Sequence, residues 1–238
     1  MTIDTDAIRA FICTPLFGLT LTLGFFQLSA WLFRKSGEFP LLHPVLTAAI
    51  PIAAVIYYLP MDYREYADST ELLTILLGTA TVALAVPLYH QLPTIRSEAP
   101  AVVVTLLIGA TVAPLSAIVI VWLTGGNMET LLSVAPKSVT TPIAMAVSES
   151  MGGLISVTAG TVISVGVFGA VVTVPLMRIM RIENQAVLGF TLGLSAHGVG
   201  TAKAFECSTT AGAFASLGLA LTGALTAIAM PLIYHLLF

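Results

Sequence analysis

The sequence predicts an all-α integral membrane protein, and three observations support this fold class. Hydrophobic residues make up 57% of the 238 residues, charged residues only 9%, and the mean hydropathy is +0.99. Such a chain has too little polar surface to cover a water-facing exterior. Its apolar stretches alternate with short polar gaps, and two stretches are interrupted by proline, glycine and polar residues. The pattern predicts about six crossing helices plus two broken or re-entrant helical hairpins, arranged as a transporter-like inverted repeat.

Six stretches resemble ordinary crossings, because each approaches the roughly 20 apolar residues that span the hydrocarbon of a bilayer. In chain order they are Ala10–Phe33, Leu41–Leu59, Leu72–Leu92, Ala101–Thr124, Leu154–Met177 and Phe214–Phe238. Pro87 is expected to kink the third. We therefore expect residues 1–238 to form a single polytopic membrane domain, in which 1–99 holds the scaffold helices one to three and 212–238 the last helix.

The fifth stretch, Leu131–Val147, contains the sequence APKSVTTP at 135–142. Pro142 lacks an amide donor, and both Pro136 and Pro142 push the preceding residue away from helical angles. The helix must therefore break, and a half-helix is expected to begin with Thr141 as its N-cap and Pro142 at its first position. The seventh stretch, Ala186–Phe205, contains the second break, SAHGVGT at 195–201.

Basic residues in the gaps indicate how the chain is threaded. Arg34 and Lys35, then Arg96, then Arg178 and Arg181 occupy three different gaps, whereas the gap MDYREYADSTE after the second stretch is mostly acidic. The positive-inside rule places all three basic gaps in the cytoplasm only if the fifth stretch is re-entrant, with both termini outside. The alternative is a bundle of seven or eight crossings with kinked helices.

An internal repeat supports the re-entrant interpretation. Shifting the chain by 60 residues aligns Thr141 with Thr201, Gly109 with Gly169, and one break with the other. Repeat one is assigned to residues 100–150 and repeat two to 160–210, each a crossing followed by a broken segment. In this topology the second unit is an upside-down copy of the first, and transporters place their sites at such interfaces.

The first break offers groups for binding an anion. Lys137 is a cation inside the bundle, for which a functional role is the default interpretation, although at the membrane surface it would only snorkel to water. Hydroxyls are supplied by Ser138, Thr140 and Thr141, with Pro142 beside them. Thr141 could equally serve only as the helix cap.

The second break offers His197, Gly198, Gly200 and Thr201. The glycines permit backbone angles closed to other residues and close approach of a ligand. His197 could bind substrate or carry a proton, because its unperturbed pKa lies near neutrality, or it could simply be hydrogen-bonded within the bundle.

Three further charged residues are candidates for proton transfer or ion pairing. Lys203 and Glu206, three residues apart on one helix face, can form a pair. Glu149 is expected near the exit of the first broken segment and is a weaker candidate. Cys13 and Cys207 have no metal or redox spacing, and we expect two free thiols.

Two half-helix N-termini plus Lys137 suit a small anion, and a hydroxyl-rich lining favours a hydroxy- or keto-carboxylate. Chloride or an amino acid would fit the same description. The sequence carries no nucleotide loop, zinc spacing, nucleophile elbow or pair of catalytic acids, so we expect no enzyme activity, no cofactor, no metal and no nucleic-acid partner.

The chain resembles the LrgB/CidB family. The resemblance rests on FPLLHPVL at 39–46, LLGTATVALAVPLY at 76–89, PKSVTTPIAM at 136–145, SAHGVGTAKAFE at 195–206 and GAFASL at 212–217. It departs at Lys203, where members often carry Arg, and at Ala211, where they often carry an acid.

The resemblance implies a protein of the bacterial cytoplasmic (inner) membrane. Bacterial members are described as antiholin-like modulators of murein hydrolase activity and lysis that act with a small LrgA/CidA-type membrane partner. Plant relatives are plastid glycolate/glycerate translocators, and some bacterial members are linked to pyruvate uptake. We therefore expect a secondary transporter of small 2-hydroxy or 2-keto monocarboxylates (glycolate, glycerate, lactate or pyruvate), with proton or sodium coupling and homo-oligomerisation both open. The alternative is the antiholin-like regulator.

Overall fold

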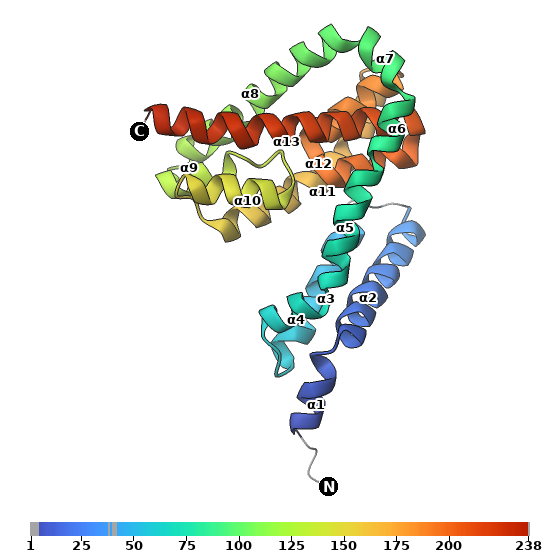
Figure 1. Cartoon of the computed structure of the whole chain (residues 1–238), viewed down its shortest axis with the longest axis vertical. Helices are drawn as coiled ribbons and strands as arrows, with labels where there is room; N and C mark the ends of the chain where they lie inside the picture. The colour runs from blue at the N-terminus through green and yellow to red at the C-terminus, as the bar shows by residue number, and fades with distance from the viewer. Residues whose placement is uncertain (1–4, 38, 40–41, 238) are drawn as a thin grey trace. The chain divides into compact units, whose positions relative to one another are not determined.

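In this computed structural model the described residues, which are 5–37, 39 and 42–237, form helices joined by turns, and none of them is in a strand. The chain divides into two compact units, Met1–Ala83 and Leu84–Phe238 (Figure 1). The all-helical prediction is therefore confirmed. Leu41 and Phe238, where two predicted stretches begin or end, lie outside the described residues.

Among the described residues, five helical stretches are long and apolar enough to cross a membrane. They are Pro15–Lys35, Glu71–His90, Ala99–Leu123, Ile155–Ile179 and Thr209–Leu236. The second predicted crossing is the exception, because its helix, α3 (Pro44–Tyr58), has only 15 residues. That length gives about 22 Å, short of a hydrocarbon core of about 30 Å. Pro44 opens the helix, and Leu59 is extended because Pro60 follows it.

The first unit contains α1 (Thr5–Ile12), α2 (Pro15–Lys35), α3, α4 (Tyr63–Ser69) and α5 (Glu71–Ala83). The predicted first stretch, which starts at Ala10, is divided, because Thr14 caps a new helix that has Pro15 at its start. The Thr22 hydroxyl lies 2.7 Å from the Tyr66 hydroxyl and ties α2 to α4. The acidic gap after the second stretch was expected only to connect crossings, and it contains α4 instead.

The predicted third stretch loses regular helix hydrogen bonding at Leu84, just before the expected kink at Pro87, although Leu84 keeps helical backbone angles (φ −61°, ψ −18°). Helix α5 ends at Ala83, and α6 (Ala85–His90) begins after Leu84. Pro87 explains the position, because a proline removes the hydrogen bond to the carbonyl four residues earlier, which is that of Ala83. A further short helix, α7 (Leu92–Ser97), precedes α8 (Ala99–Leu123).

The second unit continues with α9 (Met128–Val134), α10 (Thr141–Ser150), α11 (Ile155–Ile179), α12 (Gln185–Cys207) and α13 (Thr209–Leu237). Helix α13, red in Figure 1, runs past both α12 and α10. Its contact with α12 is close because Gly189 and Gly193 of α12 lie directly against the backbone at Ala211 and Ala215. Two buried hydrophobic clusters of the unit include residues from both α12 and α13.

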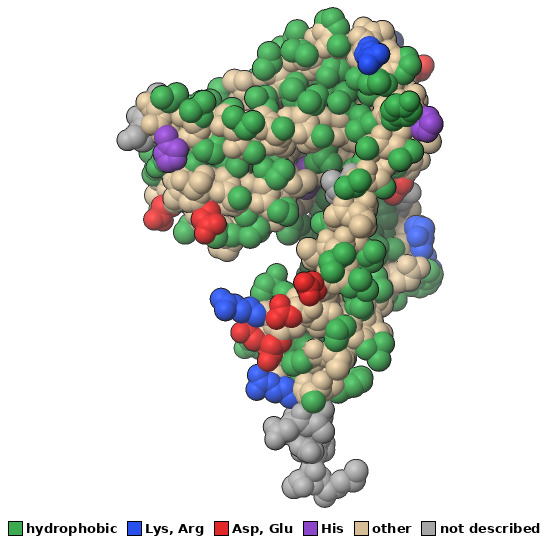
Figure 2. Space-filling view, viewed as in Figure 1, with side chains coloured by type: hydrophobic (Ala, Val, Ile, Leu, Met, Phe, Trp, Pro, Cys, Tyr) green, Lys and Arg blue, Asp and Glu red, His purple; other side chains and the backbone are tan. Residues whose placement is uncertain are grey.

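Much of the outer surface is apolar, as expected for a protein in lipid. Large side chains such as Trp122 and Ile228 are 66% and 71% exposed, and hydrophobic side chains are spread over the whole face seen in Figure 2. Together with the five candidate spans, this surface identifies a multi-pass membrane protein.

Candidate functional site

The first helix break lies where proline spacing predicts it. Helix α9 ends at Val134, a turn carries residues 135–140, and α10 resumes at Thr141. The cap assignment was wrong by one residue, because Thr140 occupies the N-cap position and Pro142 the second helical position. An N-cap residue needs an extended backbone conformation, and Thr140 adopts one with φ −61° and ψ 146°. The Thr140 side chain makes no capping hydrogen bond, so its hydroxyl is not used for the helix start.

Lys137 lies half-buried in this turn. Among the described residues, no carboxylate lies within ion-pairing distance of its ammonium group. Ser138 beside it is buried. The first-turn amides of α10 also lack partners within the helix, as at every helix start. A cation, hydroxyls and free amides are therefore gathered at one turn.

The first broken segment, residues 128–154, folds back on itself. The Leu154 amide donates to the Ser133 hydroxyl at 2.7 Å, although 21 residues separate them. Thr158, one turn into α11, donates to the Ser148 hydroxyl at 2.8 Å. The start of α11 therefore lies against both α9 and α10.

The second break lies inside α12 at Ala196 and His197. His197 has φ 41° and ψ −128°, close to the first central residue of a type II′ turn, which reverses the chain and normally prefers glycine. Its Nε2 donates to the Val162 carbonyl at 3.0 Å, and the Thr201 hydroxyl donates to the His197 carbonyl at 2.8 Å. These bonds hold an otherwise unfavourable backbone conformation.

The second broken segment, residues 185–208, also folds back. A straight helix of 23 residues would separate its ends by about 34 Å, yet the Ser208 hydroxyl donates to Gln185 Oε1 at 3.0 Å. Gly200 allows the return, because it lies directly against the Leu192 carbonyl and Ala196. Gly198, by contrast, is exposed and has open space where a side chain would be.

Helix α11 connects the two breaks through Val162. Its carbonyl accepts the His197 hydrogen bond, and its side chain packs in one cluster with Val139 and Ala144 of the first break. All three side chains are at most 1% exposed. Sequence reasoning missed Val162, because an apolar residue in an apolar helix carries no signal of this role.

The remaining charged candidates lie away from the breaks. Lys203 and Glu206 form the expected pair at 2.9 Å, with side chains 25% and 66% exposed. Glu149 is exposed at the last turn of α10, as expected near the end of the first broken segment. Cys13 and Cys207 are free thiols, as predicted. No group of three His, Cys, Asp or Glu side chains suited to a metal occurs among the described residues.

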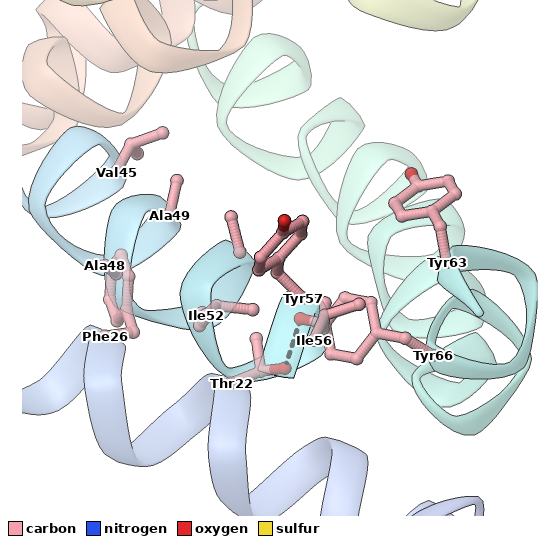
Figure 3. A pocket seen from close by; sticks show the side chains of 11 residues that line it. Thr22, Phe26, Val45, Ala48, Ala49, Ile52, Ile56, Tyr57, Tyr63 and Tyr66 are labelled. Carbon is pink, nitrogen blue, oxygen red and sulfur yellow. Dashed lines mark hydrogen bonds between the residues drawn. The ribbon is translucent and has the colours of Figure 1, made fainter. Parts of the chain in front are cut away.

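A groove lies elsewhere, in the first unit. It has a volume of about 570 Å³ and runs between α2, α3 and α4, with Ala48, Ile52 and Tyr57 in its wall (Figure 3). Its lining is almost entirely apolar, which suits an alkyl chain rather than an anion. The volume of a groove therefore does not locate a polar site, and the two helix breaks are the candidate on the basis of their chemistry.

Comparisons with known proteins agree with the resemblance noted in the sequence. The LrgB-like family model matches residues 22–236. A Bacillus subtilis (strain 168) protein described as uncharacterized protein YwbG is 38% identical over 189 residues, which cover 79% of this chain and 84% of that protein. An uncharacterized Haemophilus influenzae protein is 34% identical over 194 residues, covering 82% and 84%. Holin-like protein CidB of Staphylococcus aureus (strain Mu50) is 27% identical over 199 residues, covering 84% and 87%. No solved structure matches.

Proposed function

This chain belongs to the LrgB-like family, and from that premise we propose that it is a holin-like membrane protein that regulates murein hydrolase activity and lysis. The supporting observation is that relatives from Staphylococcus epidermidis and Staphylococcus aureus, at 28% and 27% identity, are named holin-like protein CidB. In this proposal the chain acts in the bacterial inner membrane with a small LrgA/CidA-type membrane partner. It performs no catalysis itself.

Complementation tests the regulatory role. A host strain that lacks its own LrgB-like protein receives the parent chain or an empty vector, each with and without an LrgA/CidA-type partner. We expect the parent with its partner to change the autolysis rate and the murein hydrolase activity of cell extracts. A double variant, Lys137→Ala with Thr141→Ala, should retain the effect if regulation needs only membrane association. Identical rates with parent and empty vector would contradict the role.

A second candidate function, transport of small 2-hydroxy or 2-keto monocarboxylates, is favoured by the geometry of the breaks. The observation that carries it is Lys137, a half-buried cation without a carboxylate partner among the described residues. Interrupted membrane helices with a charge in the gap are typical of transporter binding sites. The comparisons favour regulation and the geometry favours transport, and one protein can do both.

In the transport proposal the substrate carboxylate lies between the two breaks. The half-helix α10 and the half-helix that follows His197 each present free amides and about half a positive charge. Lys137 supplies a full charge, while Ser138, Thr140, Thr141 and Thr201 supply hydroxyls. Because both breaks contact Val162, a shift of α11 would alter both sides of the site together.

Proteoliposomes test transport directly. Purified parent protein should take up labelled glycolate, glycerate, lactate or pyruvate under an imposed proton or sodium gradient. The Lys137→Ala, Thr141→Ala double variant, reconstituted at equal density, is the matched control and should take up far less. No uptake of any of the four anions under either gradient would contradict the transport proposal and leave the regulatory one standing.

The proposal extends to the threading of the chain. We take α3 as a short sixth crossing and both broken segments as re-entrant, with residues 100–150 and 160–210 as inverted repeats and both termini outside. The chain is then a single polytopic domain that can self-associate. Support comes from the Ser208–Gln185 hydrogen bond, which joins the two ends of the second broken segment. The Leu154–Ser133 bond brings the end of the first broken segment back to α9.

A further inference from the structure

Thr222, on α13, is buried without a hydrogen-bond partner. Its side chain is 2% exposed. Among the described residues, its Oγ1 is the one fully buried side-chain nitrogen or oxygen that has no partner. Ser216 on the same helix shows the usual arrangement, because its hydroxyl donates to the Gly212 carbonyl at 2.8 Å. A buried hydroxyl without a partner is disfavoured, so an unpaired one needs an explanation such as a ligand.

The neighbours of Thr222 on α13 show which way its side chain points. A Cβ on Gly218 would lie 2.9 Å from the Phe190 carbonyl oxygen of α12, and one on Gly223 would lie 3.2 Å from Ile143 of α10. Thr222 is one turn beyond Gly218, rotated by roughly 40° toward the direction of Gly223. Its side chain therefore points between α12 and α10, closer to α12.

The register between α12 and α13 shows which part of α12 lies beside Thr222. Gly189 lies against Ala211 and Gly193 lies against Ala215, so the first half of α12 runs parallel to α13. The next turns bring Thr222 to the level where that half-helix ends and the chain reverses, at His197. Ile143, which meets the neighbouring Gly223, belongs to the first turn of α10. Thr222 thus lies where α13 passes both helix breaks.

We propose that the Thr222 hydroxyl is a ligand of the substrate, donating a hydrogen bond to the carboxylate of a small monocarboxylate held between the two breaks. This inference rests on the transport proposal and adds a third helix, α13, to the site. It explains the buried hydroxyl between Leu221 and Gly223, which has no partner among the described residues. Binding of the anion satisfies the hydroxyl that is unpaired in its absence.

The test compares binding with folding. Thr222→Val keeps the shape of the side chain and removes only the hydroxyl. For labelled pyruvate and glycolate bound to purified full-length protein, we expect Kd to rise by about 10- to 100-fold, the range for a hydrogen bond to a charged group. We expect the melting temperature of the unliganded variant to stay equal or rise, because an unpaired buried polar group has been removed. A purely structural hydroxyl would leave Kd unchanged.

Ser216→Ala is the matched control, because it removes a buried hydroxyl from the same helix that already has a partner. Its Kd should equal that of the parent. If Thr222→Val does not fold, Thr222→Ser and Thr222→Ala are compared, and the serine variant alone should keep the affinity of the parent. Equal affinity of parent and Thr222→Val, or of the serine and alanine variants, would overturn the inference while the transport proposal survives. A parent protein that binds and transports none of the anions would overturn both.

Discussion

At the scale of single residues, Lys137 and Lys203 can be told apart by their surroundings. Lys137 has no carboxylate within ion-pairing distance among the described residues, whereas Lys203 pairs with Glu206 at 2.9 Å. If Lys137 contacts the substrate carboxylate, Lys137→Gln removes the cation but keeps hydrogen-bonding capacity. We expect Kd for glycolate or pyruvate to rise by about 10- to 100-fold, measured by equilibrium binding to purified protein.

Lys203→Gln is the control for this experiment. It should change Kd much less and leave the yield of folded protein nearly unchanged, because the Lys203 and Glu206 side chains are 25% and 66% exposed and such a pair contributes little stability. The opposite pattern, with Lys137→Gln binding as tightly as the parent and Lys203→Gln failing to bind, would move the anion to the second break.

A second prediction at this scale concerns pH and the first unit. The Asp62 backbone amide and the Arg9 guanidinium both donate to Glu65 and lower the pKa of this carboxyl below its ordinary value of 4.5. Because the folded pKa is the lower one, the stabilisation is complete above pH 4.5 and is lost as pH falls through the folded value. The melting temperature should fall over that window, and by less in Glu65→Gln.

The expected shift is small, because the Arg9 and Glu65 side chains are 59% and 31% exposed. Asp68→Asn on the same helix serves as the control for loss of one negative charge. Parallel curves for the parent and Glu65→Gln between pH 6 and pH 3 would show that the Arg9–Glu65 contact does not stabilise the fold.

The sequence predicts the positions of both helix breaks. It does not predict which residue caps α10 or which residue adopts the strained backbone conformation. Pro136 and Pro142 predict the first break from steric rules alone. The capping residue was missed by one, because Thr140 and Thr141 are equally good caps and only the chain path selects between them. The strained backbone of His197 could not be foreseen, since a glycine, Gly198, stands next to it and satisfies the same sequence pattern.

At the scale of elements, the second broken segment depends on close contact between its two halves. Gly200 lies directly against the Leu192 carbonyl, so a methyl group there must move backbone, whereas Gly198 has open space around it. We expect Gly200→Ala to destabilise the protein by about 1–3 kcal/mol. Gly198→Ala should be neutral or stabilising by up to about 1 kcal/mol, because alanine favours a helix. Denaturant unfolding in detergent measures both.

Equal stability of Gly200→Ala and Gly198→Ala would show that the fold-back tolerates extra volume and would remove the reason for glycine at position 200. Substrate binding by the Gly200→Ala variant also tests the position of the second half-helix. If Gly200→Ala keeps its fold but loses binding, the second half-helix has shifted away from the first.

Two element-scale differences from the sequence expectation have identifiable causes. Helix α4 was missed although Asp62 and Glu65 have the spacing of a capping box, and the structure shows that box. Hydropathy alone places this stretch in a gap between crossings, because its acidic residues make it polar. Helix α3 is shorter than its apolar run because proline bounds it on both sides, a signal that hydropathy alone does not weigh.

At the scale of the whole molecule, hydropathy predicts the fold class. The packing of the helices against one another depends on contacts between residues far apart in the sequence. Five of the six expected crossings are long and apolar enough among the described residues. The contact of Val162 with both breaks depends on how α11 packs between distant segments, and no local pattern in the sequence encodes it. Local propensity and periodicity predict single elements, whereas the contacts of α11 with α10 and α12 depend on how the chain packs.

The last prediction tests the threading of the chain with single cysteines in intact cells. In a Cys13→Ser, Cys207→Ser background, Met128→Cys and Ser150→Cys mark the two ends of the first broken segment, and Ser97→Cys marks the gap expected in the cytoplasm. All three positions are exposed. If the segment is re-entrant, an impermeant thiol reagent added outside should label the first two equally and Ser97→Cys only after permeabilisation. In a Cys13→Ser background with native Cys207, exposed at the end of α12, the reagent should again react only after permeabilisation. Labelling of Met128→Cys and Ser150→Cys from opposite sides would make the first broken segment a crossing, and the inverted repeat would then be wrong.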